Sequence, residues 1–113
     1  MISIHDLRAR FESDPVPLQW GAIASDLARL SAIVQSGDIH SLFFQNVLNE
    51  AKLFTEWLAP EVDFEGQATI LSLQRWLSKW PASGGSEESS RQVEKEAEEW
   101  SERILNLSGL LSQ

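Results

Sequence analysis

The chain has 113 residues, 17 acidic against 9 basic side chains, a net charge of −8 at pH 7 and no cysteine. The charge disfavours nucleic acids and anionic membranes as partners. The lack of cysteine excludes disulfides, thiolate metal sites and cysteine nucleophiles, and no apolar run approaches the ~20 residues that span a bilayer. We therefore expect a cytoplasmic protein, with one domain over residues 1–113.

Five segments have helical periodicity, and no strand or hairpin pattern occurs. The first runs from about Ile4 to Glu12, with Ser3 as its cap, and "SDPVP" ends it because two prolines cannot continue a helix. The second begins near Pro17, since proline is tolerated in a first helical turn. Its apolar stripe consists of Trp20, Ile23, Leu27, Leu30 and Val34.

The third segment, Ile39 to Leu58, is apolar over about two thirds of its circumference, which is typical of a central helix. We expect Asp38 to cap it and Pro60 to end it. The fourth segment runs from about Phe64 to Trp80. Its main stripe is Ile70, Leu73, Leu77 and Trp80.

The fifth segment begins within "SEESS" and runs almost to the end of the chain. Its apolar residues alternate spacings of four and three, and the stretch before it, about residues 81–88, is predicted to be a flexible connection. Short connections between long amphipathic helices favour antiparallel neighbours. The sequence therefore predicts an all-α fold, an up-and-down four-helix bundle with a short extra N-terminal helix. The seam of the fifth segment is Val93, Ala97, Trp100, Ile104, Leu107 and Leu111.

The stretch "APEVDFEG", residues 59–66, has the acid spacing that begins an EF-hand calcium loop. Glu61 and Asp63 fall at positions one and three, and Gly66 falls at position six. The register fails at position twelve, where Ser72 stands in place of the bidentate glutamate. We interpret Asp63 as the N-cap of the fourth helix and expect neither a metal nor a cofactor.

The two histidines, His5 and His40, do not indicate catalysis. Two phenylalanines follow His40 closely, whereas a phosphotransfer histidine would need small and basic neighbours. The chain lacks the Glu-x-x-His motifs of a di-metal bundle, a phosphate loop and a recognisable nucleophile–base pair. We therefore expect that the protein is not an enzyme.

Asn46 and Glu50 are the polar exception in the third segment. They are four residues apart, so they lie on one face, and the helical wheel places that face inside the apolar arc. A buried glutamate must be paired, neutral or close to water. One interpretation is a structural contact with Arg8, Arg10 or Arg29, and the other is the polar floor of a ligand pocket.

The stretch "RWLSKW" is the most conspicuous basic and aromatic spot on an acidic chain. Trp80 belongs to the predicted core stripe, whereas Trp76 lies at its edge beside Arg75 and Lys79. Tryptophan and arginine dominate the hot spots of protein interfaces, which favours a partner-binding role for Arg75, Trp76 and Lys79. The alternative is that Trp76 closes the rim of the bundle and the two basic residues complement the helix C-terminus.

The fifth segment has an acidic outer face and an apolar end. Glu87 with Arg91, and Glu99 with Arg103, are spaced for i,i+4 ion pairs on a solvated face. Leu105 and Leu110 point away from the seam on opposite sides, and one bundle does not easily cover both. We therefore predict a homodimer through this helix.

These observations favour a non-enzymatic helical protein-interaction module, regulatory or adaptor-like, that binds a protein partner. The alternative is a small-molecule-binding helical bundle with a polar pocket near Asn46 and Glu50. A closed, well-packed bundle with an exposed apolar rim would support the first function. A large cavity that reaches Glu50 would support the second.

Overall fold

The computed structural model describes residues 3–37, 41–80 and 87–109, and within these ranges all regular structure is helical. The α-helices are α1 (Ile4–Ser13), α2 (Val16–Gln35), α3 (Leu42–Leu58), α4 (Phe64–Leu77) and α5 (Glu87–Ser108). A single 3-10 turn (Ala59–Glu61) follows α3. The predicted all-α bundle with a short extra N-terminal helix is confirmed.

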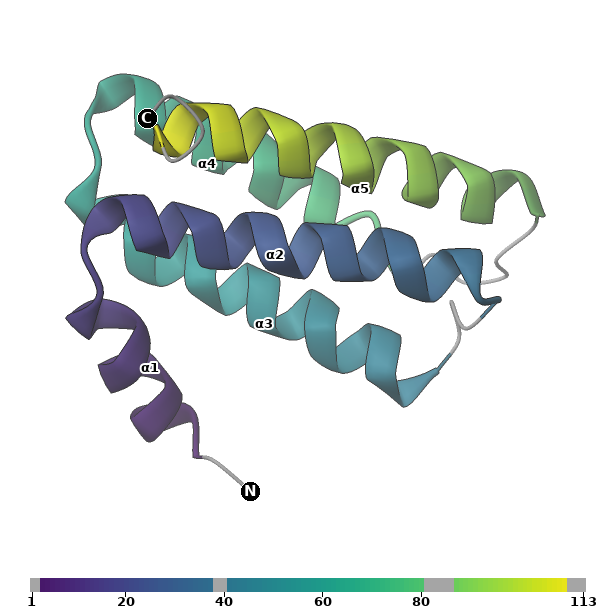
Figure 1. Ribbon diagram of the computed structural model, residues 1–113, viewed down its shortest axis with the longest axis horizontal. Coiled ribbons are helices and arrows are strands. Elements are labelled where there is room, and N and C mark those ends of the chain that lie inside the picture. The colour runs from purple at the N-terminus through teal and green to yellow at the C-terminus, as the bar shows by residue number, and fades with distance from the viewer. Residues whose placement is uncertain (1–2, 38–40, 81–86, 110–113) are drawn as a thin grey trace.

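The long helix α2 lies between α5 and α3, and both of these run antiparallel to it (Figure 1). Helix α4 packs against α3 and lies behind α5 in this view, while α1 sits at an angle against α3. No described helix has the length and apolar composition needed to cross a membrane. Most of the predicted flexible connection, residues 81–86, lies outside the described residues.

Side-chain caps fix the starts of three helices. Ser3 accepts a hydrogen bond from the backbone N–H of Asp6, and Asp63 accepts one from Gly66 at 2.8 Å, as the sequence predicts. Helix α3 begins three residues later than predicted, and its cap is Ser41. The predicted cap, Asp38, lies outside the described residues.

Gly66 follows the Asp63 cap for a packing reason. A Cβ atom on this residue would lie 2.8 Å from the Cβ of Val62, which is closer than two carbon atoms pack. The glycine therefore lets the extended residue Val62 lie directly against the first turn of α4. The Asp63 cap and this close approach explain Asp63 and Gly66, two of the three residues that match the start of a calcium loop.

The core is built chiefly from α2, which buries residues on two sides because α3 and α5 both pack on it. The apolar arc of α3 is only partly buried, since Leu42 and Phe43 are exposed near its start and Leu53 is half-buried. Leu107 of α5 is also exposed, at 42%, although the heptad pattern places it on the seam. The largest fully buried side chains are Phe44, Ile23, Leu27, Leu30, Leu48, Leu58, Ile70, Leu73, Leu77 and Ile104.

Candidate functional site

Trp76 of α4 is buried and faces α5. Its side chain is 5% exposed, and its indole Nε1 donates a hydrogen bond of 2.8 Å to Oε1 of Glu96. Its ring also meets Trp80 edge to face, with centroids 6.3 Å apart. The predicted position of Trp76 at the edge of the α4 stripe fits this contact, but a side chain that is 5% exposed is not an exposed anchor for a partner.

Trp100 differs from the other four tryptophans because it is only half-buried. The guanidinium carbon of Arg103, one turn further along α5, lies 4.7 Å from the centroid of its ring. This is a cation–π contact. Within the described part of α5, the predicted Glu99–Arg103 ion pair does not form, because Arg103 lies over the indole.

These residues surround a cleft of about 230 Å³ between α4 and α5, which we call the Trp76–Trp100 cleft. Glu96 is fixed there by Trp76 and by a weaker contact of 3.4 Å from the side-chain amide of Gln92. Glu99 is exposed at the rim. The cleft therefore combines two indoles, two carboxylates and one guanidinium, and its lining residues are Trp76, Glu96, Glu99, Trp100 and Arg103.

Arg75 and Lys79 are exposed and do not line this cleft. On a helical wheel, Phe64, Ala68, Leu71 and Arg75 fall within about 60° of one another, and all four are exposed. We call these four residues the α4 outer strip. Phe64 is 86% exposed and Leu71 57%, so the strip is an apolar surface that ends in a basic residue.

The structure separates the predicted pair in α3. Asn46 is exposed, so its predicted burial is wrong, whereas Glu50 is half-buried. The predicted arginine partners do not pair with Glu50 among the described residues: Arg8 pairs with Glu12, and Arg29 pairs with Asp26. The group that interacts with Glu50 is a second carboxyl group, that of Asp26 in α2.

Asp26 is the residue that the sequence analysis missed. Its side chain is 0% exposed, and apart from the guanidinium of Arg29, 3.3 Å from Oδ1, no donor in the described ranges reaches its oxygens. Burial, the charge of Glu50 and a hydrogen bond with Glu50 raise the pKa of Asp26 to about 8, and Arg29 opposes this shift. A protonated Asp26 supplies the donor that two carboxylates would lack.

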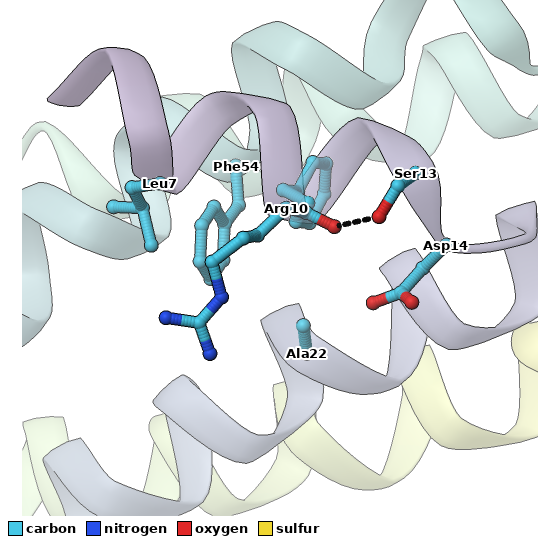
Figure 2. A pocket seen from close by; sticks show the side chains of 7 residues that line it. Leu7, Arg10, Ser13, Asp14, Ala22 and Phe54 are labelled. Carbon is cyan, nitrogen blue, oxygen red and sulfur yellow. Dashed lines mark hydrogen bonds between the residues drawn. The ribbon is translucent and has the colours of Figure 1, made fainter.

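A cavity of about 390 Å³ lies between α1, α2 and α3 (Figure 2). Leu7 and Arg10 of α1 and the Asp14 that follows it extend toward Ala22 of α2, with Phe54 of α3 behind them. Ala22 is one helical turn before Asp26, and Phe54 is one turn after Glu50, so the carboxyl pair lies beyond one end of this cavity. Asn46 and Glu50 do not line it.

The predicted dimer residues have different positions. Leu105 is half-buried and packs against the core, and Leu110 lies outside the described residues.

In the described chain, no three histidine or acidic side chains are grouped so that they could hold a metal ion. Comparison with known proteins adds no relative: no family model, no curated protein and no solved structure matches this chain.

Proposed function

We propose that the protein is a non-enzymatic helical protein-interaction module, regulatory or adaptor-like, located in the cytoplasm. The observation that supports this most is the α4 outer strip. Large apolar side chains on a solvated helix are normally scattered, whereas here Phe64 and Leu71 are aligned on one face. A basic residue, Arg75, ends the strip on a chain whose net charge is −8.

An interface on this strip would use Phe64 and Leu71 as apolar anchors and Arg75 as a charged contact. Arginine and aromatic residues are enriched among interface residues that contribute most to affinity. Lys79 extends the basic end of the strip. Trp76, which is predicted to bind the partner together with Arg75 and Lys79, is buried beneath this surface. It would support the surface by holding α4 against Glu96 of α5.

Leu71→Asp is expected to reduce capture of the partner about tenfold, because it places an unpaired charge in the apolar part of the interface. Affinity co-purification from the native cell, followed by quantitative mass spectrometry, measures this loss. Since Leu71 is exposed, the change in the free energy of unfolding should stay within about 0.5 kcal/mol. Leu18→Asp in α2, another exposed leucine, is the matched control. If both variants capture the same proteins as the wild type, the α4 outer strip is not the interface.

A second candidate function, small-molecule binding, draws its support from the cavity between α1, α2 and α3. Its volume of about 390 Å³ falls in the range of ligand pockets, and it has an apolar floor with Arg10 and Asp14 at its rim. Neither Asn46 nor Glu50, the residues predicted to form a polar pocket, lines this cavity. Mass spectrometry of the co-purified small molecules, done on the same sample, distinguishes a bound ligand from a bound protein.

We also propose self-association through the C-terminal helix, with Leu107 as the exposed apolar residue that the dimer covers. Light scattering after gel filtration should give a dimer for the wild type and a monomer for Leu107→Glu. Leu105→Glu is a poorer test, because Leu105 packs against the core and its replacement would also lower stability. A monomeric wild-type protein at micromolar concentration would rule out the dimer.

A further inference from the structure

The Trp76–Trp100 cleft already holds a cation that belongs to the chain itself. Arg103 places its guanidinium 4.7 Å from the ring centroid of Trp100, within the range of a favourable cation–π contact. Its ordinary surface partner would be Glu99, four residues earlier, yet no ion pair joins the two in the described structure. The indole face is therefore the position that a guanidinium occupies here.

The carboxylates of the cleft favour positive charge as well. Glu96 is held by the indole of Trp76, so its charge is fixed close to the lining of the cleft. Glu99 is exposed and has no ion-pair partner within the described residues. With Arg103 displaced, two carboxylates would remain beside the half-buried indole of Trp100.

We propose that this cleft binds a lysine or arginine side chain from a basic segment of a protein partner, which replaces Arg103 over Trp100. The inference rests on the proposed function and names the chemistry of the partner. A basic segment complements the net charge of −8. The cleft volume, about 230 Å³, is below the range of about 300–1,000 Å³ usual for small-molecule pockets, which favours one inserted side chain over a whole ligand.

The test uses a short probe in place of the unidentified partner. An acetylated, amidated Gly-Lys-Gly peptide is titrated into the 15N-labelled full chain, and the indole N–H resonances of the five tryptophans are followed. The resonances of Trp76 and Trp100 should shift and saturate, while that of Trp20, buried in α2, should not. The same peptide with norleucine, which has no charge, should cause no shift.

Two pairs of variants test the site against general surface charge. Arg103→Gln removes the internal competitor and should tighten binding of the lysine peptide about two- to fivefold, the range of an exposed cation–π contact. Glu99→Gln should weaken it by about the same factor. The controls are Arg91→Gln and Glu102→Gln, which make the same charge changes on exposed positions of α5 away from the cleft.

Several outcomes would overturn the inference. Equal effects of Arg103→Gln and Arg91→Gln would show a general charge effect, and equal shifts with the norleucine peptide would show that charge is not recognised. Binding of tetramethylammonium without binding of the lysine peptide would assign the cleft to a small quaternary cation. The proposed function can fail separately. If the peptide binds at Trp100 but the native chain captures no partner, only the interaction module is contradicted. If Leu71→Asp loses the partner but the peptide does not bind, only the proposal that the cleft binds a basic side chain is contradicted.

Discussion

Asp26→Asn should make the protein more stable at pH 8 by several kcal/mol, because the wild type loses stability as the pH rises from 3.8 to about 8 and an asparagine at this buried position does not titrate. Asn has nearly the shape of Asp and carries its own donor, so it can bond to Glu50 without taking up a proton. Urea unfolding at pH 8 measures the difference between the variant and the wild type. Asp14→Asn, at an exposed aspartate, should leave stability within about 0.5 kcal/mol of the wild type.

The same substitution should change the pH dependence of stability. The pKa of Asp26 is about 8 in the folded chain, against 3.8 for an ordinary aspartate, so between these values the folded state holds a proton that the unfolded state has released. The contribution of this group to stability is therefore complete below pH 3.8 and is lost as the pH rises toward 8. One such proton corresponds to a slope of about −1.4 kcal/mol per pH unit.

The difference in unfolding free energy between Asp26→Asn and the wild type should thus be small near pH 4 and grow up to about pH 8. Taking the difference removes the shared contribution of the other acidic groups. Parallel pH profiles for the two proteins would mean that Asp26 titrates normally. Lower stability of the variant at pH 8 would mean that the buried carboxylate is the form that the fold prefers.

The helices and two of their caps could be predicted because their causes are local. A capping oxygen such as that of Ser3 or Asp63 acts on a backbone N–H three residues away, and proline interrupts a helix wherever it stands. The start of α3 was harder, because both Asp38 and Ser41 precede its apolar run. The burial of Asp26 does not follow from the predicted stripe of α2, because that stripe describes only one of the two buried sides of the helix. Ile33, two turns further on the same side, is buried too and is the signal that marks a second face.

The Trp76–Trp100 cleft could not be predicted in the same way. Trp76 is predicted at the edge of the α4 stripe and Trp100 on the seam of α5, but their meeting depends on how α5 is aligned along α4. That alignment follows from the packing of α5 on α2, including the hydrogen bonds from Ser31 to Glu94 and from Ser101 to Ala24. Contacts of such large sequence separation are not encoded in local periodicity. The position of Arg103 depends on this packing as well, because the accessible face of Trp100 and the carboxylate of Glu99 compete for the guanidinium of Arg103.

The attachment of α1 depends on one aromatic cluster. Phe11 is buried and stacks on Phe54 of α3, with ring centroids 4.4 Å apart and planes 13° apart, and Trp57 lies 5.9 Å away. Helix α1 has only ten residues, which is too few for a stable isolated helix in water. The other apolar residues on its face contribute less, because Leu7 is half-buried and Ile4 is exposed.

Phe11→Ala should therefore release α1 from the bundle while the four long helices stay folded. The loss of the stacked ring is worth about 3–5 kcal/mol, more than the remaining contacts of α1 are expected to supply. Amide hydrogen exchange should show α1 losing nearly all its protection, with α2 and α5 unchanged. Ile4→Ala, which alters an exposed residue of the same helix, should leave exchange in α1 unaltered. Equal loss of protection in all five helices would instead mean that α1 folds as one cooperative unit with the bundle. Because α1 and Asp14 form one wall of the cavity beside Phe54, its release would also abolish any small-molecule binding there, whereas the lysine peptide should still bind between Trp76 and Trp100.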